Sequence, residues 1–229
     1  MIFKISTAML ILFTLTGVAQ TKTYKIEEDF NRIKITNKIN AEIIPGAKET
    51  KVVVEGYGSE DLKWNVKQGE LKLSLPLDEL FSESDTKVKL YVNSFIALTL
   101  NNGAEVEVSE KLNQKHLEID LSEGSFLSAE LDVKDIRVKS VSGATVQLSG
   151  ETKHYYCTVK TGGIANTKHL ISSNADVKVS YGGSIRANVT KSIRAAVTAG
   201  GTIYIYGKPS KINQKTKLGG EIKRMSKLD

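Results

Sequence analysis

Glycine recurs at a nearly constant interval over the C-terminal part of this 229-residue chain. The seven positions are Gly103, Gly124, Gly143, Gly162, Gly182, Gly200 and Gly219, which are separated by 21, 19, 19, 20, 18 and 19 residues. The column five residues before each glycine is apolar until its last member: Leu98, Ile119, Val138, Cys157, Val177, Ala195 and Gln214. The column seven residues before is apolar throughout: Ile96, Leu117, Ile136, Tyr155, Ala175, Ile193 and Ile212. Inward-pointing side chains at every second position predict short strands on both sides of a tight glycine corner.

The constancy of these columns distinguishes between two all-β architectures. Consecutive antiparallel hairpins also alternate, but they do not require the same apolar type at one fixed offset in every unit. Stacked coils do, because each inward side chain rests on its counterpart in the neighbouring coil. The pattern predicts an all-β fold, a parallel β-helix or β-roll solenoid of about seven coils over residues 94–225.

The N-terminal third lacks the glycine register but keeps strand patterns between turn signals. Strands are predicted around residues 32–35, 51–54, 64–66 and 71–75, with a hairpin turn at Gln68-Gly69. Because an open solenoid end exposes both core and strand edges, residues 24–92 are expected to form an N-terminal β cap and irregular coils. Short helical turns are expected at residues 79–84 and 110–115. No linker composition separates the two parts, so residues 20–229 are predicted to form one domain.

The first 19 residues have the pattern of a secretory signal peptide. Lys4 is followed by an apolar stretch, and Gly17-Val18-Ala19 precedes the expected cleavage at Ala19-Gln20. Cleavage leaves 31 basic and 26 acidic residues, a net charge near +5. We therefore expect a secreted or periplasmic (cell-envelope) protein with no stable membrane insertion. Because the protein is expected to be exported, we do not expect it to bind nucleic acid. A glycan or a cell-surface protein is the expected partner.

Residues suited to catalysis or metal binding are few and scattered. One cysteine and three histidines argue against a Cys/His zinc site, and no cofactor motif is found. Cys157 lies in an inward column and is interpreted as a core residue. Glu118 and Asp120 stack against Arg137 and Lys139 of the next coil, which predicts an ion-pair ladder more than a catalytic pair. The histidines, His116, His154 and His169, are expected at the surface near coil junctions.

A candidate ligand-binding surface lies four and six residues after the later glycines. Those outward positions are Arg186, Asn188, Tyr204, Tyr206 and Lys223. Aromatic rings stack on sugars, and amides and cations bind hydroxyls or carboxylates, so the pattern is compatible with glycan binding. The alternative is ordinary packing of tyrosines on a strand surface. A basic segment at residues 208–227 follows, and its lysines are expected to protect the last coil from end-to-end pairing.

Several of these motifs together resemble a known family. They are Phe30, Ile33 and Ile35; Ile43 and Gly46; Val52 and Val54; the run Gly69-Glu70-Leu71-Lys72-Leu73; and the Gly-Gly-x-Ile coils at Gly182, Gly200 and Gly219. The chain resembles the putative auto-transporter adhesin family, head GIN domain, over about residues 30–225. The resemblance implies a right-handed β-helix and a role in cell adhesion, with no catalytic residues to transfer.

The function expected from these observations is that of a non-catalytic secreted or periplasmic β-helix, which acts in cell-surface adhesion or in envelope or glycan interaction. Two alternatives stay open. One is a polysaccharide-processing β-helix enzyme, which would depend on Glu118 or Asp120. The other is a structural module that self-assembles through its strand edges.

Overall fold

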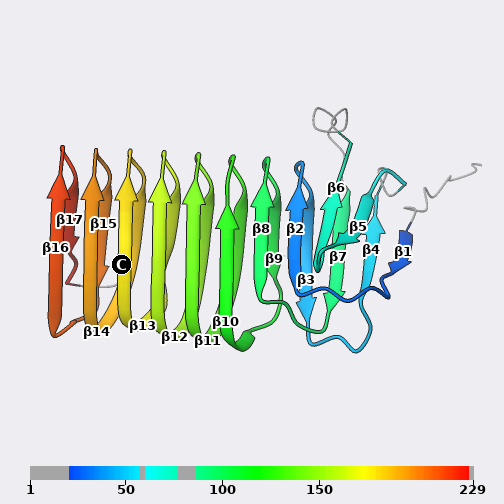
Figure 1. Cartoon of the computed structure of the whole chain (residues 1–229), viewed down its shortest axis with the longest axis horizontal. Coiled ribbons are helices and arrows are strands. Elements are labelled where there is room, and N and C mark those ends of the chain that lie inside the picture. The colour runs from blue at the N-terminus through cyan, green and yellow to red at the C-terminus, as the bar shows by residue number, and fades with distance from the viewer. Residues whose placement is uncertain (1–20, 57–59, 77–85, 227–229) are drawn as a thin grey trace, which may run out of the picture.

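The structure is a computed structural model that describes residues 21–56, 60–76 and 86–226. Within those ranges all regular secondary structure is β, and 17 strands form one continuous hydrogen-bonded network (Figure 1). The N-terminal strands are β1 (Thr21–Lys25), β2 (Arg32–Thr36), β3 (Asn40–Pro45), β4 (Lys51–Glu55), β5 (Lys63–Lys67), β6 (Glu70–Ser74) and β7 (Lys87–Val92). The repeat region contains β8 (Ala97–Asn101), β9 (Glu105–Val108), β10 (Leu112–Leu121), β11 (Phe126–Val141), β12 (Thr145–Lys160), β13 (Ile164–Ser180), β14 (Ser184–Thr198), β15 (Thr202–Tyr206), β16 (Lys211–Lys217) and β17 (Glu221–Arg224).

The repeats stack as parallel coils, which confirms the predicted β-solenoid. We call the strand before each glycine corner face 1 and the strand after it face 2. Face 1 comprises β8, β10, the second halves of β11 to β14, and β16. Face 2 comprises β9, the first halves of β11 to β14, β15 and β17. The chain passes from face 2 to face 1 of the next coil through a rounded turn, here called the bend. Figure 1 shows the sharp glycine corners along one edge of the molecule and the bends along the other.

Each corner is made by two consecutive residues in the left-handed conformation. At Glu123-Gly124, for example, the φ angles are 57° and 72°. The next residue in every coil is small, because the backbones of neighbouring coils approach closely there: Ala104, Ser125, Ala144, Gly163, Gly183, Gly201 and Gly220. A Cβ at Gly183 would lie 2.4 Å from the carbonyl oxygen of Gly163. The glycine spacing therefore marks both the corner and a place of close stacking between coils.

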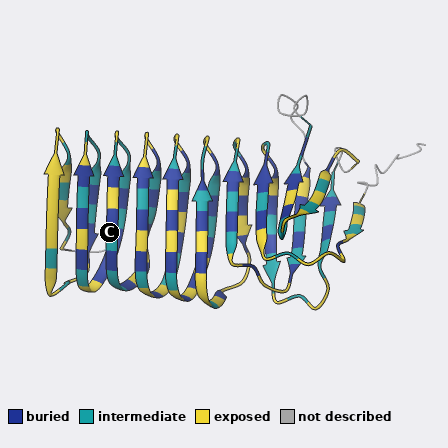
Figure 2. Cartoon of the chain, in the orientation of Figure 1, coloured by how far each residue is buried: buried dark blue, intermediate teal, exposed yellow. Residues whose placement is uncertain are grey.

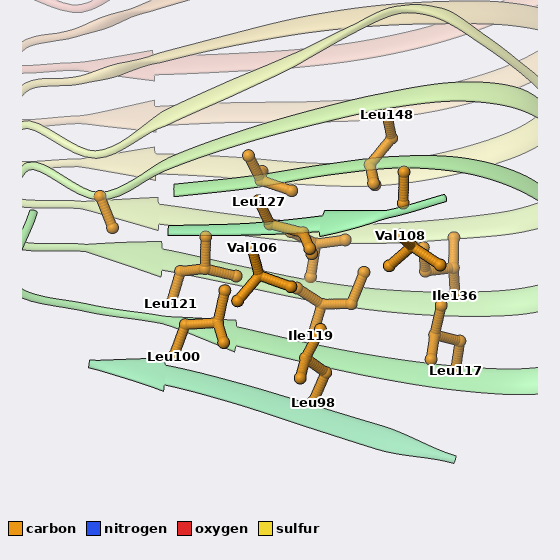
Figure 3. Packing of buried hydrophobic residues seen from close by; sticks show 14 of the residues in the cluster. Leu98, Leu100, Val106, Val108, Leu117, Ile119, Leu121, Leu127, Ile136 and Leu148 are labelled. Atoms are coloured by element: carbon orange, nitrogen blue, oxygen red, sulfur yellow. The ribbon is translucent and has the colours of Figure 1, made fainter. Parts of the chain in front are cut away.

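The inward columns form one continuous apolar core between the two faces (Figure 2). Figure 3 shows Leu98, Ile119 and Leu117 of face 1 packing toward Val106 and Val108 of face 2. The predicted columns end as expected at the last coil but not at the first. Gln214 is exposed, since the last coil has no neighbour on one side in the described chain. Ile96 was expected to point inward, but it is 51% exposed.

The prediction at Ile96 was wrong because its coil is not entered from a preceding bend. The chain arrives at β8 from β7, and Phe95 takes the buried place, with 1% of its surface exposed. The helical turn expected at residues 110–115 is also wrong. Residues from Leu112 onward already belong to β10, where they pair with β11. The turn expected at residues 79–84 and the proposed signal peptide lie outside the described residues.

The N-terminal strands extend the stack, but they do not stack in the order in which they follow along the chain. β2 and β3 form a coil that pairs in parallel with β8 and β9 on one side and with β6 and β7 on the other. β4 pairs antiparallel with β1 and β7, and β5 and β6 form the predicted hairpin. The β2–β3 corner has no glycine; Asn37 and Lys38 adopt φ angles of 65° and 54° instead. Asn37 is held there by its Nδ2, which donates to the carbonyl oxygen of Leu75 at 2.7 Å.

Cys157 confirms the inward register, because it is a free, buried thiol. Burial raises its pKa to about 12, against 9.0 for an ordinary thiol. We expect Cys157 in the native protein to react with a thiol reagent only as fast as the protein unfolds, and to react rapidly in urea. Because the unfolded thiol loses its proton first, this group should also make the free energy of unfolding fall as the pH rises from 9.0 toward 12. Native labelling as fast as that of the unfolded chain would contradict the inward position.

Candidate functional site

Three of the five residues predicted as a ligand surface do come together on face 2. Arg186 of β14, Tyr204 of β15 and Lys223 of β17 are direct neighbours on successive coils. The guanidinium carbon of Arg186 lies 5.1 Å from the centre of the Tyr204 ring, and Nζ of Lys223 lies 6.0 Å from it. Lys223 also contacts Glu221 at 3.0 Å, and the hydrogen bond to that carboxylate raises the pKa of Lys223. Tyr204 is thus engaged by a cation from each neighbouring coil.

The other two residues, Asn188 and Tyr206, are not on the exposed surface, and this part of the prediction was wrong. Each is 6% exposed, and the two are paired neighbours. The preceding coil contains extra residues after Thr167, where the register shifts, so the β14 coil turns into its bend earlier. Nδ2 of Asn188 donates to the carbonyl oxygen of Lys168 at 3.0 Å inside that bend. The strand alternation would point the sixth residue after each glycine outward. It ends one residue before that position, so Asn188 and Tyr206 are buried instead.

A pocket on face 1 was not predicted. It has a volume of about 400 Å³ and crosses β12, β13, β14 and β16. Its polar lining consists of His154, Tyr156, Asn174, Asp176, Ser192, Arg194, Lys211 and Asn213. We call it the face-1 pocket. The sequence did contain a signal for this pocket. The outward positions six and eight residues before the later glycines are polar or aromatic, and they fall side by side on neighbouring coils.

The polar side chains of the face-1 pocket are held in place by contacts within and between coils. Oδ2 of Asp176 accepts a hydrogen bond from Nη1 of Arg194 at 2.9 Å, and Nζ of Lys178 lies 3.7 Å from its other oxygen. Oγ of Ser192 donates to Oδ1 of Asn174 at 2.7 Å. These contacts fix an array of acceptors and donors on a rigid sheet.

An aromatic ring stands beside this polar array. Tyr156 is 40% exposed, and the guanidinium carbon of Arg137 lies 5.3 Å from its ring centre. An exposed ring next to fixed polar groups is the combination that recognises sugars, since the ring covers the apolar face of the sugar and the polar groups bind its hydroxyls. Among the described residues that line the pocket, Asp176 supplies the single carboxylate. Glycoside hydrolysis ordinarily needs two.

The predicted ion-pair ladder is confirmed on the same face. Arg137 Nε lies 3.6 Å from Glu118, and Lys139 Nζ lies 3.1 Å from Asp120. His116 lies 3.2 Å from Asp135 and is exposed. In the described part of the chain no three His, Cys, Asp or Glu residues gather as a metal site. No helix among the described residues has the length and apolar character of a membrane span.

Comparisons with known proteins agree with this architecture. A putative adhesin from Bacteroides fragilis has a similar structure, with a TM-score of 0.83 and 21% identity, over 92% of this chain and 98% of that one. A putative adhesin from Parabacteroides merdae has a TM-score of 0.71 and 16% identity over the same shares. A putative lipid binding protein from Parabacteroides distasonis has a TM-score of 0.69 and 15% identity, again over 92% and 98%. At these identities the structures establish the fold alone. No curated protein matches the chain.

The sequence itself matches one family model. The model described as "Putative auto-transporter adhesin, head GIN domain" covers residues 29–209, which is most of the chain and includes the face-1 pocket up to β14. The match agrees with the motifs of the coil corners and of the N-terminal strands. The chain therefore belongs to the family of putative auto-transporter adhesins with the head GIN domain.

Proposed function

We propose that this protein is a non-catalytic, exported recognition protein that binds glycans through the face-1 pocket and acts in cell-surface adhesion. The observation that carries the proposal is the exposed ring of Tyr156 beside the fixed side chains of Asn174, Asp176 and Arg194. Membership of an adhesin family supports the adhesive role and the location at the cell surface or outside it. The signal-peptide pattern of residues 1–19 supports export.

The scaffold suits recognition more than chemistry. The groups of the pocket sit on long strands whose registers are set by neighbouring coils, so a ligand meets a preformed surface. The enzyme alternative would use Glu118 or Asp120, but both carboxylates are engaged by cations of the next coil. Replacement of either by Ala would have to abolish turnover of a polysaccharide for that alternative to hold.

The surface predicted on face 2 is the weaker candidate for glycan binding. Tyr204 is only partly exposed and has a cation near its ring from each neighbouring coil, Arg186 and Lys223, whereas the exposed ring of Tyr156 has a single cation near it. The contacts of Tyr204 favour the alternative interpretation, packing along the sheet. Comparing the glycan binding of Tyr156→Ala with that of Tyr204→Ala therefore shows which of the two surfaces binds the ligand.

The test is retention of residues 20–229 on an array of uncharged and charged glycans. We expect selective retention by the wild-type protein and at least ten-fold weaker binding by Tyr156→Ala, because stacking of a sugar on an aromatic ring contributes about 1.4 kcal/mol or more. Tyr204→Ala is the matched control and should bind within two-fold of wild type. If Tyr204→Ala loses binding and Tyr156→Ala keeps it, the ligand site lies on face 2. If no glycan is retained, the proposal is wrong.

A further inference from the structure

Lysines line the bend of successive coils. Lys115, Lys134 and Lys153 stand in β10, β11 and β12, and the registers on both sides of them align all three coil upon coil. Ser173 follows in β13, and Lys191 stands at the bend of β14, after a one-residue shift in register. All four lysines are exposed. The bend thus presents a row of cations parallel to the solenoid axis.

This arrangement of charge differs from that on face 1. There the chain stacks opposite charges, as in the pairs Glu118–Arg137 and Asp120–Lys139. Neighbouring coils are about 4.8 Å apart, and like charges directly opposite each other at that spacing are destabilising. None of the lysines of the bend forms an ion pair with any residue that the structure describes. A row of cations without ion-pair partners is what an external polyanion would stabilise.

The same lysines line a groove, which we call the bend groove. It has a volume of about 660 Å³ and is lined also by Asn113 and Gln114, whose amides can bind sugar hydroxyls. Two carboxylates, Asp132 and Glu151, lie in the same lining. Four lysines against two carboxylates leave the groove with a net charge of +2. Its amides favour a hydroxyl-bearing ligand over a bare ionic surface, and the exposed side chain of Ile171 adds an apolar contact.

We propose that the bend groove binds an extended acidic polysaccharide, whose chain runs along the solenoid axis and whose carboxylates or sulfates meet the lysines of successive coils. The coil spacing is close to the length of one sugar residue in an extended chain, so the charges of the polymer and of Lys115, Lys134 and Lys153 can stay in register. A flat lipid surface would not enter a groove. The site is separate from the face-1 pocket, since Tyr156 does not line it, and it does not depend on that pocket.

The test uses polygalacturonate as the acidic polymer and uncharged dextran as its control. The variant Lys115→Gln/Lys134→Gln/Lys153→Gln removes three cations from the bend groove. The matched variant Lys139→Gln/Lys215→Gln/Lys217→Gln removes three exposed cations from face 1, so the two have the same net charge. We expect the wild-type protein to bind polygalacturonate but not dextran, the bend variant to lose at least about ten-fold in affinity, and the face-1 variant to stay within two-fold.

Several outcomes would overturn the proposal. Equal losses in the two triple variants would show a response to net charge alone. Tighter, lysine-dependent binding to phosphatidylcholine vesicles containing phosphatidylglycerol than to polygalacturonate would assign the lysines to a lipid surface. If the protein does not bind polygalacturonate, the bend groove is not a site for acidic polysaccharide. Retention of glycans through Tyr156 is measured independently, so the face-1 pocket can fail while the bend groove stands, and the reverse.

Discussion

Gly150→Ala is expected to lower the free energy of unfolding by about 3 kcal/mol or more. Gly150 lies in β12, where it pairs with Leu131 of the neighbouring coil. A Cβ at Gly150 would stand 2.0 Å from the carbonyl oxygen of Leu131, and that oxygen is backbone and cannot swing aside. The φ angle of 100° at Gly150 adds strain for any side chain. Relief of the contact would require the two coils to separate locally.

Gly143→Ala is the matched control for this prediction. Gly143 also has a positive φ, 75°, but a Cβ there would meet nothing within 4 Å. Its replacement by Ala should lower the free energy of unfolding by only about 1 kcal/mol, the cost of the left-handed conformation. Urea denaturation of the two variants compares the costs directly. Equal destabilisation by the two substitutions would mean that the close contact between coils at Gly150 does not add to the cost of a side chain there.

Val138→Asp is expected to destabilise the protein by roughly 4 kcal/mol or to prevent folding. Val138 is 1% exposed and lies between Ile119 and Cys157 of the neighbouring coils, so the inserted carboxylate would have apolar neighbours on both sides. It would have to be buried unpaired or to take up a proton. A narrow core between two sheets leaves little space for the side chain to reach water.

The control for this change is the next residue along the strand. Lys139 points outward, is half exposed, and pairs with Asp120. Lys139→Ala should cost less than about 1 kcal/mol, since exposed ion pairs contribute little. Thermal unfolding followed by circular dichroism measures both variants. A Val138→Asp protein as stable as Lys139→Ala would contradict the inward assignment of the column.

The repeat region was predictable because one sequence feature fixes several structural ones. A glycine such as Gly124 marks the corner, and the apolar columns at fixed offsets from it mark the two inward faces. The stacking then determines which outward residues meet, so the pair Asp120–Lys139 followed from the register alone. The prediction was wrong where a coil is entered differently, as at Ile96, or where the bend begins earlier, as at Asn188.

The N-terminal coil was less predictable for a physical reason. Its corner uses Asn37 and Lys38 in place of glycine, and Asn tolerates the left-handed conformation well enough to make the turn without the expected signal. The order in which its strands stack also departs from chain order, because β2 and β3 lie between β6–β7 and β8–β9. Local patterns predict the strands but not such an exchange of neighbours.

The face-1 pocket could be assembled only partly from the sequence. The register placed Tyr156, Asp176 and Arg194 in one outward column, and their proximity follows from it. The neighbouring column with Asn174 and Ser192 lies next to the bend, where coil lengths vary by one or two residues. The hydrogen bond between those two side chains therefore depends on the three-dimensional course of the bend.

We propose that this solenoid recognises a glycan without altering it. The most direct test is to recover a glycan retained by the protein after prolonged incubation and to measure its chain length, alongside its affinity for wild type and for Tyr156→Ala. We predict an unchanged chain length and at least ten-fold weaker binding by the variant. A shortened glycan, with turnover that disappears in Glu118→Ala or Asp120→Ala, would contradict the account and establish an enzyme.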